Sequence, residues 1–258
     1  MSLLGLIAYK LIPTRIFNGL RVVRSPDLIL PFENVTYCQD GLATAHNAEF
    51  MRDERFARAY WKGYETGSWG GVNIHWRAFV ACWAAERAVH LEGDFVECGV
   101  NRGGLSRTVI EYVGADVFKD RKYYLLDTYE GLIEDLISEE EAKLGRKAGG
   151  YAECYDAVRT TFAPFENAVV IRGRVPETLS EVKAEKVAYL SIDMNCAEPE
   201  IAAAEFFWDK LVSGAAMVLD DYGWTDHIVQ KRAFDQFAKK RNVPILGLPT
   251  GQGLILKS

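Results

Sequence analysis

Acidic residues lie where several buried strands are predicted to end. Carboxylates at these positions could bind a ligand or take part in catalysis. Glu97 is the first, in the stretch Gly93–Gly104, which reads E-x-G-x-x-x-G through Gly99 and Gly103. Such glycines let the backbone come close to a ligand, and the N–H groups of the following helix face it. Because the acid precedes the first glycine, the loop suits a cationic ligand such as S-adenosylmethionine (SAM) better than a pyrophosphate. The alternative is an ordinary Gly-rich turn without a ligand.

A second acid, Asp127, closes the apolar run Tyr123–Asp127 and is followed by Thr128. A carboxylate at the end of the second strand of an α/β unit can accept hydrogen bonds from both hydroxyls of a ribose. The alternative is an Asx turn or a helix N-cap at Asp127 and Thr128. Together with Glu97 and its glycines, Asp127 favours a nucleoside cofactor.

Three further acids close two later apolar runs: Asp193 after Val187–Ile192, and the pair Asp220 and Asp221 after Ala215–Leu219. In a doubly wound sheet such strand ends share one edge, so the carboxylates would repel one another unless a cation lies between them. Hard oxygen ligands suit Mg²⁺, Mn²⁺ or Ca²⁺. The alternative is that Asp220 and Asp221 cap the next helix.

Alternating strands and helices must position these side chains. Strand–helix alternation with apolar strands is typical of an α/β fold with a doubly wound, mostly parallel sheet. Only Pro249–Gly251 separates the last two apolar runs, so the final strand is predicted to be antiparallel. Strands are predicted over 94–99, 122–127, 168–172, 187–193, 215–220, 243–247 and 253–257, and helices over 105–115, 151–162, 177–183, 198–212 and 226–241.

The amino-acid composition indicates the class of protein. The 258 residues are 49% hydrophobic and 26% charged, which is ordinary for a soluble globular protein. A net charge of −6 gives no support to nucleic-acid binding. The five cysteines are scattered without a C-x-x-C pair, which favours reduced thiols and a cytoplasmic location.

The first 90 residues are predicted to be a helical extension with a lid, ahead of a catalytic domain over 91–258. Residues 1–26 carry apolar residues at helical spacing and only basic charges. Such a segment docks onto its own domain or a second subunit, or alternatively lies on an anionic membrane surface. Residues 25–47 are expected to be irregular, the Gly-rich loop 63–71 to be a lid or a plain connector, and residues 133–150 to be a mobile insertion beside the site.

In combination, these motifs resemble the macrocin O-methyltransferase (TylF-like) family of class I SAM-dependent methyltransferases. The resemblance covers roughly residues 93–258 and includes Asp127–Leu132, Arg172–Leu179, Asp193 and Asp220–Gly223. It implies a seven-stranded methyltransferase fold and metal-assisted methylation of a sugar hydroxyl. The family's Tyr-Glu-Ser/Thr stretch after the fourth strand is replaced here by Met194–Pro199, which bears on the acceptor.

Carried over by position, the resemblance implies that Glu97, Gly99 and Asp127 hold SAM, and that Asp193, Asp220 and Asp221 hold Mg²⁺ or another hard divalent cation. An acceptor hydroxyl would lose its proton to a base, for which Asp193 is the first candidate and His227 the second. The predicted cofactor site extends to Cys98, Asn101, Gly103, Ser106, Thr128, Gly173 and Arg174.

Three functions follow from these residues. The first is SAM- and metal-dependent O-methylation of a sugar on a glycosylated metabolite or surface polysaccharide. The second is methylation of a catechol-type small molecule by the same metal chemistry. The third is a non-catalytic SAM-binding scaffold, against which the retention of all three acids argues. We expect a homo-oligomer and a small-molecule or saccharide acceptor.

Overall fold

The structure is a computed structural model that describes residues 35–258. The chain divides into two compact units, Met1–Glu49 and Phe50–Ser258. The predicted division into an extension over 1–90 and a catalytic domain over 91–258 stays a prediction. In the first unit, β1 (Tyr37–Gln39) and β2 (Leu42–Thr44) form an antiparallel hairpin where irregular chain was expected. The turn is Asp40-Gly41, with φ of 52° and 72°, a pairing typical of tight hairpins. The amphipathic segment 1–26 lies outside the described residues.

A seven-stranded sheet organises the second unit, in the order β5-β4-β3-β6-β7-β9-β8. The first five of these strands run parallel, and β9 pairs antiparallel with both β7 and β8, as predicted. The doubly wound fold is therefore confirmed. The strands are β3 (Asp94–Cys98), β4 (Tyr123–Asp127), β5 (Ala168–Arg172), β6 (Val187–Ile192), β7 (Leu211–Leu219), β8 (Leu246–Gly247) and β9 (Gly253–Leu256).

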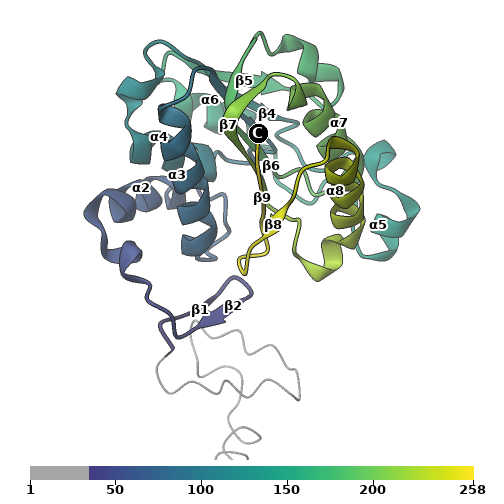
Figure 1. Ribbon diagram of the computed structural model, residues 1–258, viewed down its shortest axis with the longest axis horizontal. Helices are drawn as coiled ribbons and strands as arrows, with labels where there is room; N and C mark the ends of the chain where they lie inside the picture. The colour runs from purple at the N-terminus through teal and green to yellow at the C-terminus, as the bar shows by residue number, and fades with distance from the viewer. Residues whose placement is uncertain (1–34) are drawn as a thin grey trace, which may run out of the picture. The chain divides into compact units, whose positions relative to one another are not determined.

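Helices cover both faces of the sheet because successive strand residues point to opposite sides. Phe95 belongs to one buried core with residues of α2, α3, α4 and α6, and Val96 to a second core with residues of α7 and α8. Figure 1 shows α3 and α4 on one side and α7 and α8 on the other. The helices are α2 (Glu54–Tyr64), α3 (His75–Val89), α4 (Gly104–Val113), α5 (Glu139–Lys143), α6 (Tyr155–Phe162), α7 (Ala197–Trp208) and α8 (Ile228–Arg241).

Several predicted boundaries are wrong for local reasons. Helix α7 ends at Trp208 rather than at 212, because Leu211 already pairs with Val187 in the sheet. Gly214, with φ of 85°, allows a register shift, so β7 begins four residues earlier than expected. The predicted helix over 177–183 is the 3₁₀ segment η4 (Glu177–Glu181). The other 3₁₀ segments are η1 (Glu49–Arg52), η2 (Ala115–Phe118), η3 (Glu134–Leu136) and η5 (Thr225–His227).

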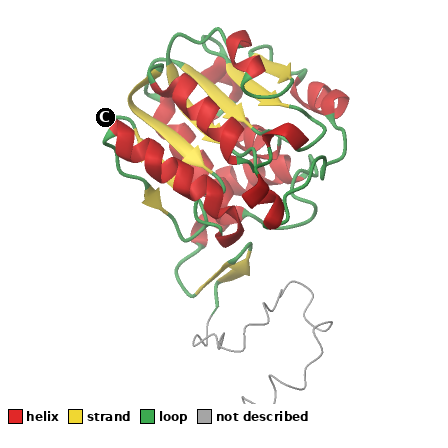
Figure 2. Cartoon of the chain, turned by 90° about the vertical axis from the view of Figure 1, so that its right-hand side faces the viewer, coloured by secondary structure: helices red, strands yellow, loops and turns green. Residues whose placement is uncertain are grey.

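The carboxyl ends of the parallel strands meet at one edge of the sheet. Strands β3 and β6 are neighbours at its centre, with Glu97 opposite Ser191 and Cys98 opposite Ile192. The acids predicted at the ends of β3, β4, β6 and β7 therefore lie along a single edge, between the helical layers seen in Figure 2. Among residues 35–258 no helix is both long and apolar enough to cross a membrane.

Candidate active site

The Gly-rich loop between β3 and α4 is packed against its neighbours. A Cβ atom on Gly99, which has φ of 89°, would lie 1.8 Å from the carbonyl oxygen of Asp193. At Gly103, with φ of 83°, it would lie 2.4 Å from the ring of Phe162. These glycines are therefore required for close packing of the loop itself, in addition to any approach of a ligand.

Asp127 binds the same loop. One oxygen, Oδ2, accepts from the backbone N–H groups of Val100 and Asn101, at 2.6 and 2.7 Å. The other, Oδ1, accepts from the N–H of Tyr129 at 2.6 Å, which is an Asx-type contact. A carboxylate offers about four lone-pair positions, so these contacts leave about one for a ligand. The predicted contact of Asp127 with a ribose stays a prediction.

Glu97 is almost completely buried, with 2% of its surface exposed. Its Oε2 accepts from the hydroxyls of Ser106 and Tyr123, at 2.7 and 2.9 Å. Burial raises the pKa of Glu97 to about 7, although the two hydroxyl donors oppose that shift. Glu97 and Ser106 thus tie β3 to α4 inside the protein, a structural role that the sequence did not indicate. Their contact with a cofactor stays a prediction.

The Gly-rich loop 63–71 covers the start of α4. Ser68 Oγ accepts from the N–H of Gly104 at 2.8 Å, and Asn101 Nδ2 donates to the Ser68 carbonyl at 3.1 Å. A Cβ atom on Gly104 would lie 2.9 Å from the indole of Trp69. The loop therefore lies against the predicted cofactor loop and occupies a helix N–H that was expected to face the ligand, and both the lid and the plain connector stay open.

The remaining predicted cofactor residues lie around Asp127. Thr128 donates from Oγ1 to the carbonyl of Gly131 at 2.7 Å, and the N–H of Gly173 donates to the carbonyl of Asp127 at 2.9 Å. Arg174 lies beyond β5, where it pairs with Glu177. The Cys98 side chain is buried in the apolar core under α7 and α8, so only its backbone can reach the edge of the sheet.

The three predicted metal ligands converge. One carboxylate oxygen from each of Asp193, Asp220 and Asp221 lies within 4.8 Å of the others. Asp220 and Asp221 are buried and Asp193 is partly exposed. They do not cap the next helix, because α8 begins after His227 and has no side-chain cap. Loss of hydration, followed by repulsion from Asp220 and Asp221, raises the pKa of Asp193 well above its usual range.

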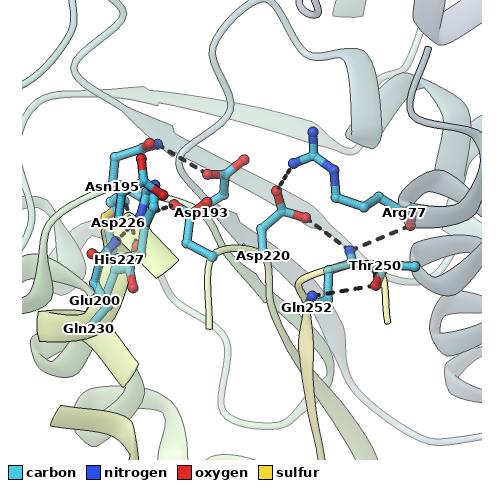
Figure 3. A network of polar contacts seen from close by, with 12 residues as sticks. Arg77, Asp193, Asn195, Glu200, Asp220, Asp226, His227, Gln230, Thr250 and Gln252 are labelled. Atoms are coloured by element: carbon cyan, nitrogen blue, oxygen red, sulfur yellow. Dashed lines mark hydrogen bonds and ion pairs between the residues drawn. The ribbon is translucent and has the colours of Figure 1, made fainter. Parts of the chain in front are cut away.

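Two side chains that the sequence did not single out bind Asp220. Arg77 Nη1 of α3 lies 2.5 Å from Asp220 Oδ2, and Gln252 Nε2 donates to Oδ1 at 2.9 Å. Figure 3 shows Asp220 between these two partners, with Asp193 beside it. A charged residue on a helix face and a glutamine after a turn carry no signal of this kind in a single sequence.

His227 lies beside Asp221 and is buried, not a surface helix residue as the sequence suggested. Its Nδ1 lies 3.2 Å from Asp221 Oδ2 and 2.8 Å from Gln230 Nε2. An amide nitrogen can only donate, so Nδ1 accepts from it and the ring proton resides on Nε2. Burial lowers the pKa of His227 to about 4, so the ring is neutral at pH 7.

The loop after β6 is held by two buried glutamates. Glu200 Oε1 accepts from the N–H groups of Met194 and Asn195, both at 3.0 Å, and Glu141 Oε1 accepts from the N–H of Ala197 at 2.7 Å. Burial, followed by the charge of Asp193, raises the pKa of Glu200 to about 8. Because Glu141 belongs to α5, the insertion 133–150 is docked beside the site rather than detached from it.

Residues 41–246 match the macrocin-O-methyltransferase (TylF) family. The chain belongs to this family. A relative from Streptomyces olivaceus, named 8-demethyl-8-(2,3-dimethoxy-alpha-L-rhamnosyl)-tetracenomycin-C 4'-O-methyltransferase, is 26% identical over 138 residues. The match covers 50% of this TylF-family chain and 53% of the relative, about half the length of each.

Solved structures show that this TylF-family chain has the class I methyltransferase fold. The O-methyltransferase NovP superposes with a TM-score of 0.60 at 19% identity, over 70% of this chain and 79% of its own. The calicheamicin methyltransferase CalS11 gives 0.55 at 14% identity, over 82% and 94%. An O-methyltransferase from Bacillus cereus, solved with S-adenosylhomocysteine (SAH), gives 0.52 at 12% identity, over 80% and 91%.

Proposed function

We propose that this protein is a SAM-dependent O-methyltransferase that requires a divalent cation and acts on a sugar hydroxyl. The observation that carries the proposal is the placement of two acid sets at one sheet edge. Asp127 and the Gly-rich loop follow β4 and β3, and the acidic triad of Asp193, Asp220 and Asp221 follows β6 and β7. Because β3 and β6 are neighbours, a methyl donor on the first set and an acceptor on the second would be adjacent.

The first set fits SAM by its chemistry. Asp127 retains lone-pair capacity toward a ribose hydroxyl after its three backbone contacts. The B. cereus neighbour was solved with SAH, the product of methyl transfer from SAM. The residues of this chain would orient the methyl donor. Asp127 and Ser68 both accept hydrogen bonds from backbone N–H groups of the Gly-rich loop and so hold it in place. A fixed donor methyl group and a fixed acceptor convert a bimolecular encounter into a positioned reaction.

The acidic triad fits a hard divalent cation. Three carboxylates within ligand distance of one another, one of them with a buried oxygen that lacks a hydrogen-bond donor among residues 35–258 (Asp221 Oδ2), form an oxygen donor set. Such a set suits Mg²⁺ or Mn²⁺. When bound, the cation would supply Lewis acidity that makes an acceptor hydroxyl more acidic.

Asp193 is the better candidate for the base that takes the hydroxyl proton. It is the partly exposed member of the acidic triad, and among residues 35–258 its Oδ1 has only the amide of Asn195, at 3.2 Å, as a side-chain donor. His227 is poorly suited, because Nδ1 already accepts from Gln230 and Nε2 holds the ring proton. We therefore assign proton removal to Asp193 and a supporting position to His227.

A sugar acceptor is supported by the name of the S. olivaceus relative, which places its methyl group on a rhamnosyl unit. The same triad would serve a catechol, and no feature of the described residues favours that acceptor. We further propose a cytoplasmic, homo-oligomeric enzyme. All five cysteines are free, consistent with a reducing compartment. Deletion of residues 1–26 should alter assembly or localisation and leave SAM binding intact.

Methyl transfer from radiolabelled SAM to methyl α-L-rhamnopyranoside and to longer rhamnosides tests the proposal, with catechol as the competing acceptor. Transfer to a rhamnoside should be lost in EDTA and restored by excess Mg²⁺, while SAM affinity measured by calorimetry stays unchanged. Full transfer in EDTA would refute the cation requirement. Transfer to catechol but to no rhamnoside would refute the sugar acceptor.

A further inference from the structure

Asp220 is the member of the acidic triad whose two carboxylate oxygens both accept hydrogen bonds from side chains. Its side chain is 1% exposed, and each of its two oxygens has its own partner, Arg77 on Oδ2 and Gln252 on Oδ1. The three residues come from α3, from the end of β7 and from the turn before β9. Figure 3 shows Arg77 on the side of Asp220 that faces away from Asp193.

Gln252 is a neutral support for Asp220. It is fully buried, and its Oε1 accepts from the hydroxyl of Thr250 at 3.0 Å. Its Nε2 also lies 3.5 Å from the backbone carbonyl of Arg77. These contacts fix the amide on both sides, so Gln252 can orient Asp220 without changing the charge of the site.

Arg77 has a different effect because it is permanently charged. Its side chain is 18% exposed, so water screens its charge only in part. One carboxylate oxygen from each of the three acids lies within 4.8 Å of the others, so a guanidinium paired with Asp220 lies close to Asp193 and Asp221 as well. Arg77 therefore acts electrostatically on all three acids, although within the triad its hydrogen bond goes to Asp220.

We propose that Arg77 is a built-in counter-ion of the acidic triad that weakens its hold on a divalent cation, with Gln252 as the neutral positioning residue for Asp220. The inference rests on the proposed function. A guanidinium next to the carboxylates offsets one of their three negative charges and repels an arriving cation. At this short separation, in a site that water screens only in part, the repulsion between two cations outweighs the loss of one hydrogen bond to Asp220.

The direction in which cation affinity changes when Arg77 is replaced distinguishes a counter-ion from a residue that only positions Asp220. If Arg77 only held Asp220 in place, removing it would loosen the site and weaken cation binding. If it opposes the cation electrostatically, removing its charge strengthens cation binding. Removing Gln252, which carries no charge, weakens binding under either description.

The experiment is a Mn²⁺ titration of the full-length protein followed by electron paramagnetic resonance, without SAM or acceptor. Arg77→Gln keeps a hydrogen-bond donor and removes the charge, so its Kd for Mn²⁺ should fall by about tenfold or more. Arg77→Lys keeps the charge and should bind like the wild type. Gln252→Leu should raise the Kd. Arg55→Met is the matched control, since Arg55 pairs with Glu86 elsewhere on the helical layer.

Equal or weaker Mn²⁺ binding by Arg77→Gln, in protein that binds SAM like the wild type, would overturn the counter-ion role. If Arg77→Gln folds poorly, Arg77→Met serves as the second variant, and its Kd for Mn²⁺ should also fall. Absence of Mn²⁺ binding by the wild type, or binding that survives Asp221→Asn undiminished, would instead refute the proposed cation site and this inference with it. The two failures are therefore distinguishable.

Discussion

The hydroxyl oxygen of Ser68 accepts a hydrogen bond from the backbone N–H of Gly104 across 36 positions of sequence. Helix α4 begins after Gly103, which has no side chain to cap it. A residue of the loop 63–71 therefore performs the capping that the helix's own N-cap residue cannot. The loop 63–71 and the Gly-rich loop after β3 are joined at the first turn of this helix.

Ser68→Ala should destabilise the protein by about 0.5–2 kcal/mol, the usual cost of losing an N-cap side chain. The variant should also expose the loop 63–71 to proteolysis, because the contact with Gly104 is lost. Urea unfolding measures the first effect, and limited chymotrypsin digestion, which cleaves after Tyr64 and Trp69, measures the second. Ser180→Ala is the control, since that exposed hydroxyl lies 3.4 Å from the carbonyl of Glu177. Equal stability of the two variants would contradict the capping role.

Asp127→Ala should weaken SAM binding roughly 10- to 100-fold, as expected for a hydrogen bond to a charged group of about 1.5–3 kcal/mol. The loss combines the ribose contact with the release of the Val100 and Asn101 N–H groups. Calorimetry with SAM measures the affinity, and circular dichroism checks the fold. Asp135→Ala is the control, because that carboxylate is exposed and pairs only distantly with Arg174. Unchanged affinity in a folded Asp127→Ala protein would rule out the ribose assignment.

Glu97 should make stability fall as pH rises. Its pKa is raised from 4.5 to about 7, so the folded state holds a proton that the unfolded state releases earlier. Between pH 4.5 and 7 the unfolded state therefore binds fewer protons, and stability decreases with pH. The contribution amounts to about 3 kcal/mol, and it is fully present below pH 4.5.

Glu97→Gln should remove this contribution. The free energy of unfolding of the wild type, measured against that of Glu97→Gln in SAM-free protein, should decline between pH 4.5 and 7 and stay level above. Comparing the two proteins cancels other buried acids, such as Glu200, that shift in the same direction. Parallel pH profiles would show that Glu97 is not protonated in the folded protein.

Glu141→Gln should destabilise the protein by about 1–3 kcal/mol, because a buried carboxylate that receives three hydrogen bonds loses acceptor capacity. Those donors are the N–H and hydroxyl of Ser138 and the N–H of Ala197. Hydrogen exchange should increase at 133–150 and at the start of α7 together. Glu139→Gln, on the exposed side of α5, should change neither. Exchange confined to 133–150 would contradict the link to α7.

The sequence was sufficient for the sheet and for the convergence of the acids, because both depend on periodicity and strand order. Asp193, Asp220 and Asp221 each follow an apolar run, and parallel topology then brings them together. The sequence could not find Arg77 or Gln252, because their relation to Asp220 is created by tertiary packing across 143 and 32 residues. His227 was misjudged as exposed for the same reason.

The sequence located the Gly-rich motif correctly, but it explained only part of why glycines are required there. Glycine at 99 and 103 was attributed to ligand approach alone, and the structure adds close packing on Asp193 and Phe162 as a second reason. The acid at the end of β3 is buried and binds Ser106 and Tyr123, and its predicted contact with a ligand stays a prediction. A short motif specifies which residue types are required at a turn, and does not specify which neighbour imposes the requirement.

The absence of a side chain at Gly99 has a consequence for how the enzyme can change. An added Cβ atom would lie 1.8 Å from the carbonyl oxygen of Asp193, so the loop after β3 and the loop after β6 are in direct backbone contact. Substitutions in the two loops should therefore show epistasis, with effects that do not add. Directed evolution of acceptor choice through Met194–Pro199 would select, at the same time, for changes in SAM affinity.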